Sequence, residues 1–408
     1  MTAPRPPERR RALTHVGGEV TRGGAREESL ALAHALDVAP PPPESKTAED
    51  DPSRAHVHGF HVYPARMHPT TASRLVEIVS VGGTKVLDPF CGSGTVLVCA
   101  MLARRDAIGT DLNPLATLLA SRKVALRDAA HDARLVAAAA RVREHADTRR
   151  KARAGAHRHY GHEDVAAFDP HVLLELDSLR DAIARETDGI VRDDLRLVLS
   201  AILTKVSRRR ADTAPLATPK RIAAGFTAKL FVKKTEELVR RTTELAALMP
   251  TPRPRAFVFV DDARELSHVR DGECGGVVTS PPYVGTYDYL EHHALRMRWL
   301  GLHTGRFEQG EMGARRHRHT MGDWQRQLGA TLDAMHRVLA PHARVAFIMA
   351  DSEVGEVAVR ADETLALVAP RAGFRPVARA SQARPHFRQT RAFATAPRFE
   401  HALLLERV

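Results

Sequence analysis

Two short segments of the chain have residue types and spacing that suit chemistry on a small ligand. The first, Val86-Leu-Asp-Pro-Phe-Cys-Gly-Ser-Gly-Thr95, is an apolar run that ends in an acid and a glycine turn. Gly92 and Gly94 would let the backbone approach a ligand, and the following helix would point its N-terminus there. Because the turn is not the phosphate-binding GxxxxGKS pattern, it suits a cofactor with a ribose and a charged tail.

Two further acids follow predicted strands and could contact the same ligand. Asp111 closes the strand after the glycine turn, where an acid accepts hydrogen bonds from both ribose hydroxyls. The alternative role for Asp111 is to cap the helix that begins near Leu112-Asn-Pro114. Asp262 follows the strand 256–260 and is placed to accept a hydrogen bond from an adenine amino group.

The second segment, Thr279-Ser-Pro-Pro-Tyr283, suits gripping a flat ring by its amino group. Ser280 supplies an acceptor oxygen, and Pro281 has a carbonyl without a competing N–H of its own. Pro281 and Pro282 fix the backbone, and Tyr283 offers a ring on which a base can stack. A surface turn is the alternative, but the segment ends an apolar strand, which argues against that reading.

The cysteines and histidines give no comparable pattern. The three cysteines, Cys91, Cys99 and Cys274, form no CxxC pair, which argues against a disulfide framework and a structural zinc site, and we expect them to be structural. The histidines also lack paired cysteines and a His-Glu helix signature, so we expect no metal. They form two groups, at positions 56, 58, 61 and 68 and at positions 157, 159 and 162.

The elements that must position these segments alternate between helices and strands. Apolar spacing predicts a helix over 71–79, a strand over 85–88, a helix over 96–104 and a strand over 106–111. This order is the first half of a doubly wound α/β sheet. Further strands are predicted over 256–261 and 275–279. A helix over 324–339 then leads into a strand over 344–349. A last helix over 356–372 leads to strands at 374–378 and 400–406.

The chain divides into four predicted parts. Residues 1–55 lack a periodic apolar face, apart from a short helical stretch at 27–36, and are predicted as a disordered tail. Residues 56–120 form the cofactor-binding first half of one domain, and residues 251–408 form its catalytic second half. Between them, residues 121–250 have helical periodicity and are predicted as a helical insertion, with target recognition as its candidate role.

The charge of the chain favours a polyanionic partner. The 408 residues include 61 Lys and Arg against 49 Asp and Glu, a formal charge of +12, and phosphates attract such a surface. A generally Arg-rich composition is the alternative. No apolar run is long enough to span a bilayer and no signal-peptide core is present, so we expect a cytoplasmic protein.

Aromatic and basic residues interleave after the catalytic segment, as expected of a nucleic-acid contact surface. Three apolar residues among them, Leu295, Trp299 and Leu300, are instead expected to pack a helix on the sheet. A basic group in the insertion is either a target-recognition region or a solvated helix face. The candidate contacts are Tyr287, Tyr289, His292, His293, Arg296, Arg298 and 315–319, with Arg208, Arg209, Arg210, Lys220, Arg221, Lys229, Lys233 and Lys234 in the insertion.

The segment Asp88-Pro-Phe-Cys-Gly-Ser-Gly-Thr95 resembles the S-adenosylmethionine (AdoMet) motif of the amino-methyltransferase family. This family includes the bacterial DNA methylases specific for the cytosine 4-amino or adenine 6-amino group. The resemblance covers about residues 58–120 and 256–408, and implies a Rossmann-like class I AdoMet-dependent methyltransferase sheet with AdoMet as cofactor. In it, Asp88, Gly92 and Gly94 border the methionine, Asp111 the ribose and Asp262 the adenine, and the motif also includes Pro89, Phe90 and Thr95.

The segment His61-Val-Tyr-Pro-Ala-Arg-Met-His68, with Tyr63 and Arg66, is similar to the family's upstream segment, which closes over the methionine end. Without the family, a loop before a helix explains it equally well.

The family resemblance implies direct displacement by the amino nitrogen of a base flipped out of double-stranded DNA, with no covalent nucleophile. Ser280 in the first motif position resembles the enzymes that act on the cytosine 4-amino group, whereas Asp or Asn is more usual for adenine. We therefore expect a site-specific DNA methyltransferase for cytosine, with adenine as the second target and a restriction endonuclease as a compatible partner. An RNA base amino-methyltransferase and a non-catalytic DNA-binding protein on this scaffold remain the alternatives.

Overall fold

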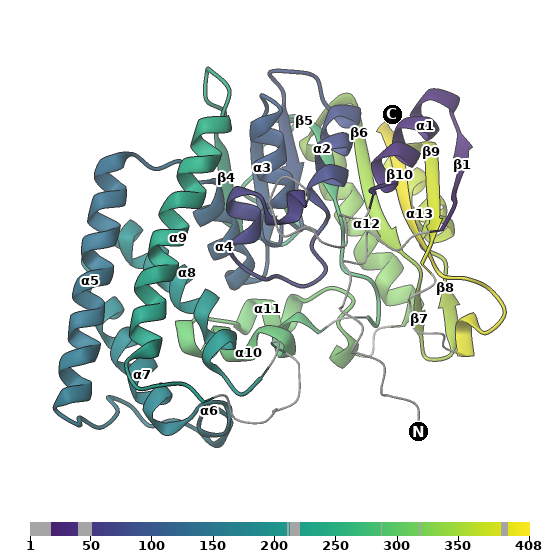
Figure 1. Cartoon of the computed structure of the whole chain (residues 1–408). Coiled ribbons are helices and arrows are strands. Elements are labelled where there is room, and N and C mark those ends of the chain that lie inside the picture. The colour runs from purple at the N-terminus through teal and green to yellow at the C-terminus, as the bar shows by residue number, and fades with distance from the viewer. Residues whose placement is uncertain are drawn as a thin grey trace, which may run out of the picture.

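The computed structural model describes residues 18–39, 51–209, 212, 221–286, 288–317, 320–384 and 391–408. Its centre is one eight-stranded sheet with the strand order β1-β9-β10-β6-β5-β2-β3-β4. Figure 1 shows this sheet beside a separate group of long helices. The strands are β1 (Val20–Gly24), β2 (Lys85–Asp88), β3 (Asp106–Asp111), β4 (Ala256–Val260), β5 (Cys274–Thr279), β6 (Leu339–Ala350), β9 (Phe374–Ala383) and β10 (Phe399–Arg407).

The five strands β4, β3, β2, β5 and β6 are parallel, and β10 is antiparallel to both β6 and β9. The order of the parallel strands reverses beside β2, the strand that leads into the glycine turn. Ligands of open α/β sheets bind at such a switch point, outside the carboxyl ends of the strands. The topology therefore confirms the Rossmann-like α/β sheet and places the first motif where a ligand belongs.

Helices cover both faces of the sheet because neighbouring residues of each strand point to opposite sides. Val86 and Val278 pack with the first layer, whereas Leu87 and Val277 pack with the second. The first layer is α1 (Arg26–Leu36), α2 (Pro69–Val79), α3 (Thr95–Leu102) and α4 (Pro114–Val124), and the second is α12 (Met321–Val338) and α13 (Ala361–Val368).

Five described helices between α4 and β4 form the insertion, and their hydrophobic core is continuous with residues of α4 and of the later helix over 289–300. Helix α10 (Tyr289–Leu300) packs into that core. Leu295, Trp299 and Leu300 were expected to pack a helix on the sheet; they do pack a helix, but against the insertion. Trp299 stacks on Tyr160 with ring centroids 5.2 Å apart. The five helices are α5 (Ala129–Lys151), α6 (His162–Ala167), α7 (Pro170–Ala184), α8 (Gly189–Val206) and α9 (Phe226–Leu248).

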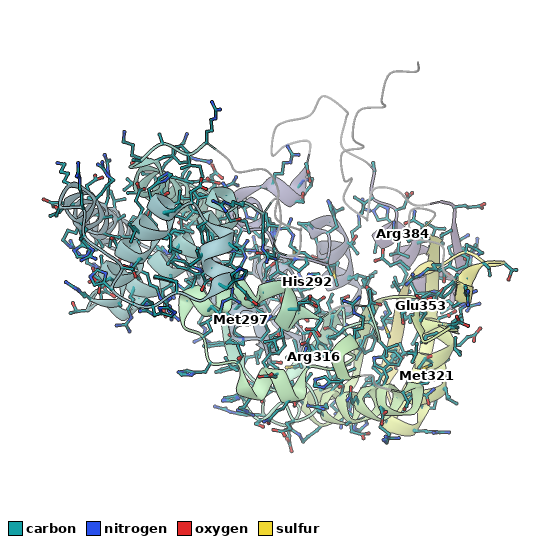
Figure 2. All side chains as sticks on the ribbon, turned by 90° about the horizontal axis from the view of Figure 1, so that it is seen from below. His292, Met297, Arg316, Met321, Glu353 and Arg384 are labelled. Atoms are coloured by element: carbon teal, nitrogen blue, oxygen red, sulfur yellow. The ribbon has the colours of Figure 1, made fainter. Side chains whose placement is uncertain are left out.

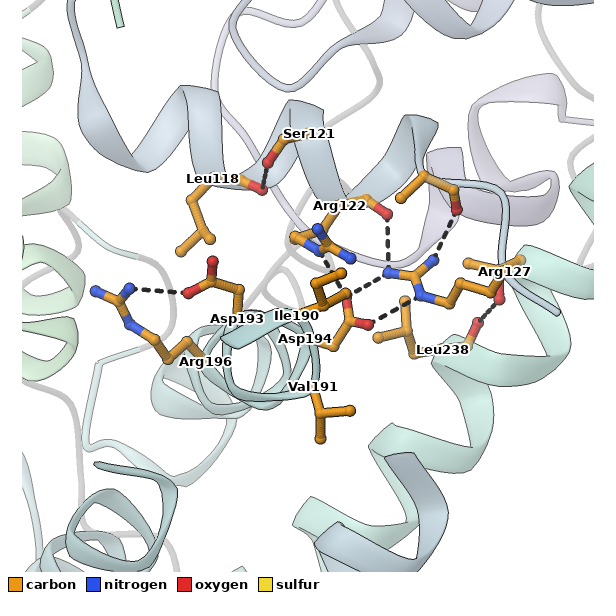
Figure 3. Close-up of polar contacts among 12 residues, drawn as sticks. Leu118, Ser121, Arg122, Arg127, Ile190, Val191, Asp193, Asp194, Arg196 and Leu238 are labelled. Atoms are coloured by element: carbon orange, nitrogen blue, oxygen red, sulfur yellow. Dashed lines mark hydrogen bonds and ion pairs between the residues drawn. The ribbon is translucent and has the colours of Figure 1, made fainter. Parts of the chain in front are cut away.

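A buried carboxylate ties the insertion to the sheet domain (Figure 3). Asp194 on α8 is fully buried and accepts hydrogen bonds from the Arg122 Nε at 2.8 Å and from the Arg127 Nε at 3.0 Å. The His131 Nε2 lies 2.8 Å from the Asp194 Oδ2, the oxygen that also accepts from the Arg127 Nε. Arg122 lies on α4 and His131 on α5, so one acid joins three helices.

Two elements differ from the sequence-based prediction. Within residues 1–55, predicted as a disordered tail, β1 pairs antiparallel with β9, and α1 buries Leu32 and Leu36 against the first layer. The tail prediction is therefore wrong for residues 20–36; residues 1–17 and 40–50 lie outside the described residues. The predicted helix over 356–372 instead begins with a hairpin of β7 (Ser352–Val354) and β8 (Val357–Val359) before α13. None of the described helices combines the length and apolar character that a bilayer crossing requires.

Candidate active site

One pocket contains residues from both sequence motifs. It holds about 910 Å³ of empty space, part of it open to solvent, where the strands β2, β3, β4 and β5 end. Most of the predicted cofactor residues line it, and so do two of the predicted catalytic residues. The predicted residues in its wall are Tyr63, Arg66, Asp88, Pro89, Phe90, Gly92, Thr95, Asp111, Asp262, Ser280 and Pro282.

The two acids that end β2 and β3 hold the glycine turn in place. Asp111 accepts a hydrogen bond from the Gly92 N–H at 2.9 Å and another from the Asn113 N–H at 2.9 Å. Asp88 accepts from the Thr279 hydroxyl at 2.7 Å, which connects the first motif to the strand of the second. Burial raises the pKa of Asp88 to about 7 and that of Asp111 to about 6. Asp111 therefore does more than cap a helix, a role that Asn113 performs.

The turn has the donors that the methionine end of AdoMet requires. The hydroxyls of Ser93 and Thr95 are buried in the pocket wall and have no hydrogen-bond partner in the described part of the chain. A Cβ added at Gly92 would lie 3.2 Å from the Tyr63 ring, so this position has no space for a side chain. Unsatisfied buried hydroxyls beside a backbone turn suit a carboxylate, and the pocket therefore fits AdoMet.

Gly94 does not line the pocket. Its backbone is left-handed, with a φ of +78°, and a Cβ there would lie 3.0 Å from Ala120 on α4. Gly94 thus starts α3 and allows α3 and α4 to pack closely.

Asp262 and Arg66 line the pocket, but both also have protein partners. Asp262 accepts a hydrogen bond from the Arg264 Nε at 2.9 Å. Burial alone would raise the pKa of Asp262, but the hydrogen bonds and charge of Arg264 lower it overall. Arg66 donates to the Ser53 carbonyl at 3.0 Å and to the His58 carbonyl. These hydrogen bonds hold the segment 53–58 in place. The roles of Asp262 and Arg66 toward adenine and methionine remain predictions.

The predicted catalytic segment contributes Ser280 and Pro282 to the pocket, while Pro281 and Tyr283 lie outside its wall. The Ser280 and Tyr283 hydroxyls are 3.3 Å apart. Tyr283 packs against the core of the second helix layer, so its predicted stacking on a base requires the ring to turn toward the pocket. This role stays a prediction.

Several pocket residues come from a segment that the sequence motifs did not single out. Glu311 is buried, accepts from the Tyr289 N–H at 2.6 Å and pairs with Arg316. The Tyr289 ring stacks at 6.3 Å on Tyr63, which brings α10 to the cofactor side. Aromatic and basic residues surround Glu311 in the sequence, but no sequence motif around it indicates a ligand-binding site. The segment's other lining residues are Phe307, Gly310 and Met312.

The predicted nucleic-acid surface is wrong for the buried residues of α10, which lies where the insertion meets the sheet domain (Figure 2). Arg296 is 1% exposed and its Nε lies 2.9 Å from Asp212, so it is not available to a phosphate. His293 is fully buried, and burial lowers its pKa to about 3. Arg298 is exposed and pairs with the exposed Glu163 at 2.8 Å, so its predicted contact with nucleic acid stays a prediction. Tyr287, Arg210, Lys220 and positions 318 and 319 lie outside the described residues.

The cysteines are unsuited to attack on a substrate. All three are free and buried, and burial raises the pKa of Cys99 and of Cys274 to about 12. Cys91 lines the pocket, but burial also raises its pKa well above the usual value. A protonated thiol is a weak nucleophile, so the site fits direct transfer better than covalent catalysis.

Comparison with known proteins matches the first part of this site. Residues 37–121 match the DNA methylase family of the N6 and N4 type. The type II methyltransferase M.MvaI of Kocuria varians is 39% identical over 69 residues, which are 16% of this chain and 15% of that protein. M.MjaII of Methanocaldococcus jannaschii is 36% identical over 69 residues, which are 17% of this chain and 13% of that protein.

Among solved structures, the rRNA methyltransferase aviRa of Streptomyces viridochromogenes is 12% identical, with a TM-score of 0.36 over 91% of this chain and 95% of that one. The chain spans about 15% of the length of M.MvaI and 13% of the length of M.MjaII. The predicted relationship to the DNA amino-methyltransferase family is thereby confirmed over residues 37–121, and with it AdoMet as the cofactor.

Proposed function

We propose that the protein transfers a methyl group from AdoMet to the 4-amino group of cytosine in DNA at specific sites. The observation that carries this proposal is the shared pocket, in which Ser280 faces the same cavity as the cofactor turn from Asp88 to Thr95. A methyl donor in the turn and an amino group at Ser280 would meet within that one cavity.

The chemistry of the proposed step is a direct displacement. AdoMet would supply an electrophilic methyl group: the amino nitrogen bonds to the methyl carbon as the carbon–sulfur bond breaks, S-adenosylhomocysteine leaves, and one amino proton passes to water. The exocyclic nitrogen of the base is a poor nucleophile because its lone pair is delocalised into the ring. The Ser280 oxygen and the Pro281 carbonyl would accept hydrogen bonds from that amino group and hold its lone pair toward the methyl group. The protonated cysteines support a step without a covalent intermediate.

The choice of cytosine rests on Ser280, and adenine is the second candidate base. The match to type II methyltransferases over 69 residues supports DNA as the substrate and a restriction endonuclease as a compatible partner. An RNA base remains the alternative because the motif chemistry is the same for both polymers.

The test is incubation of the protein with labelled AdoMet and either unmethylated genomic DNA or total RNA, followed by nucleoside mass spectrometry. Ser280→Ala should lower kcat by about 10²–10³-fold, the usual effect of removing one preorganised hydrogen bond in the transition state. Its AdoMet affinity should stay unchanged, because the cofactor turn is intact. The matched control is Ser121→Ala, whose hydroxyl donates to the Leu118 carbonyl on α4.

The products separate the alternatives. 4-Methylcytosine in DNA supports the proposal, and 6-methyladenine in DNA replaces cytosine by adenine. Label in RNA alone contradicts the DNA assignment. Absence of label in both polymers, despite AdoMet binding, would favour the non-catalytic alternative.

A further inference from the structure

Two histidines and one aspartate converge at the outer side of the insertion, away from the AdoMet pocket. His145 lies on α5, Asp181 on α7, and His157 on the connection between α5 and α6. Figure 1 shows α5 and α7 side by side at the edge of the insertion farthest from the sheet. The His145 Nε2 and the His157 Nε2 lie 3.1 and 3.2 Å from the same carboxylate oxygen, Asp181 Oδ2.

These separations are those of ligands around one metal ion. Zinc bonds of about 2.0–2.1 Å to nitrogen and oxygen place tetrahedral neighbours about 3.3 Å apart. The three ligand atoms all lie within 4.8 Å of one another. The His145 Nε2 and the Asp181 Oδ2 are both shielded from solvent, and among the described residues their contacts are ion pairs without hydrogen-bond geometry.

The surroundings of His157 hold its ring in the orientation that a metal requires. The His157 Nδ1 lies 2.9 Å from the Asp177 Oδ2, which also accepts from the His157 N–H at 2.8 Å. Tyr160 donates to the other oxygen of Asp177 at 2.7 Å. A carboxylate on Nδ1 directs the lone pair of Nε2 outward, which is the usual arrangement behind a metal-bound histidine.

A second cluster, Asp351, Asp362 and His401, lacks this character. The His401 Nδ1 is 2.8 Å from the Ser381 hydroxyl, and its Nε2 is 3.0 Å from Asp351. Asp351 also accepts from Arg360 at 2.6 Å and from two backbone N–H groups. Its oxygens are already satisfied by protein donors, so this cluster is a structural network.

We propose that His145, His157 and Asp181 bind one divalent transition-metal ion, with zinc as the best match to two imidazoles and one carboxylate. The ion would join α5, α7 and the connection before α6, which stabilises the outer part of the insertion. The three side chains are 20–27% exposed, which leaves room for a water as fourth ligand. This proposal departs from the sequence-based expectation of no metal at the histidine group 157, 159 and 162, because two of the three ligands, His145 and Asp181, come from other elements.

One cation competes for the same oxygen. The Arg185 Nη2 lies 2.7 Å from the Asp181 Oδ2, but its side chain is 64% exposed and can turn into solvent. Removing this charge should therefore favour the metal ion.

The test uses the full chain after treatment with a chelator, titrated with zinc chloride by calorimetry, with the bound metal counted by mass spectrometry. The wild type should bind one zinc ion at this site and show a higher Tm with zinc. His145→Ala should lower the zinc affinity at least about 100-fold through the loss of one ligand, and Asp177→Asn about 10–100-fold through the loss of orientation. The control His159→Ala removes an exposed histidine of the same segment and should bind as the wild type does.

Arg185→Ala gives a readout that does not depend on weakened folding, because it should bind zinc more tightly than the wild type. Cobalt in place of zinc should give the visible absorption bands of a tetrahedral site, and His145→Ala should lose them. The proposal is overturned if His145→Ala and the wild type bind zinc equally, or if Arg185→Ala binds it no more tightly. Methyl transfer does not enter either readout, so the outcome is independent of the proposed activity.

Discussion

At the scale of single residues, Asp111 links the cofactor turn to solution pH. Its burial raises the pKa to about 6, above the value of about 3.9 for an aspartate in an unfolded chain. Between these two values the folded protein without cofactor binds more protons than the unfolded chain. The contribution of Asp111 to the free energy of unfolding therefore falls as the pH rises through this range. The buried Asp88, with a pKa of about 7, acts in the same direction.

The affinity for AdoMet should change in the opposite sense. Ribose hydroxyls donate hydrogen bonds, and the ionised carboxylate is the better acceptor, so the affinity should rise with pH through about 6 and level off above about 7. Asp111→Asn should weaken binding about 10–100-fold at the plateau, since a hydrogen bond to a charged group contributes about 1.5–3 kcal/mol. Calorimetric titration with AdoMet between about pH 5 and pH 8 measures both effects.

The control is Asp106→Asn at the opposite end of β3, where the carboxylate accepts from the Arg255 N–H and does not line the pocket. This variant should keep the wild-type pH profile. Equal affinity and equal pH dependence in Asp111→Asn and the wild type would remove Asp111 from the cofactor site.

The sequence predicted the pocket residues that follow strands, because a strand end and a glycine turn fix the position of Asp88, Gly92 and Asp111. It did not predict Glu311, which reaches the pocket through a turn after a short helix, or the turning of Tyr283 into the core. These placements depend on tertiary packing, since Tyr283 packs against the second helix layer and Glu311 contacts the start of α10. No local spacing encodes that packing.

At the scale of elements, the buried Asp194 makes the junction between the insertion and the sheet domain sensitive to mutation. Its carboxylate has no exposed surface and has three basic partners, Arg122, Arg127 and His131. Asp194→Asn should lower the free energy of unfolding by about 3–5 kcal/mol, because it leaves buried arginines without a counter-charge. Denaturant unfolding followed by circular dichroism measures this loss.

The neighbouring residue provides the control for this prediction (Figure 3). Asp193 pairs with Arg196 at 3.1 Å, but its side chain is 39% exposed. Because water screens such a pair, Asp193→Asn should cost less than about 1 kcal/mol. If the two variants lose equal stability, the three-helix junction does not depend on the buried carboxylate.

Helices and strands with strong periodicity were predicted within a few residues, as in β2, β3 and α12. Strand β1 was missed because the run from Val20 to Gly24 has no apolar alternation; it pairs at the edge of the sheet through its backbone. The sequence predicts the region of α1 as part of a disordered tail because the apolar face of this helix is short. Its burial depends on α2 and β9, which are far away in the sequence.

At the scale of the whole molecule, α10 joins the two parts of the fold, because it packs into the core of the insertion and its Tyr289 lines the pocket. Many of the basic side chains of the insertion and of α10 have acidic partners, such as Arg208 with Asp169 at 2.7 Å. The formal charge of +12 is therefore a better guide to a polyanionic partner than any single arginine.

This charge leads to a prediction for the proposed DNA complex. Each phosphate that a Lys or Arg neutralises releases counterions, so the affinity should fall linearly with salt on a log–log plot. With about 6–10 phosphate contacts, the loss between about 50 and 200 mM salt is about 10³–10⁵-fold. Fluorescence anisotropy with a labelled duplex measures the slope, and AdoMet binding serves as the control because AdoMet carries no phosphate group. A duplex affinity that does not depend on salt would mean that the excess of basic residues does not contact DNA, and the case for a nucleic-acid substrate would then rest on the pocket alone.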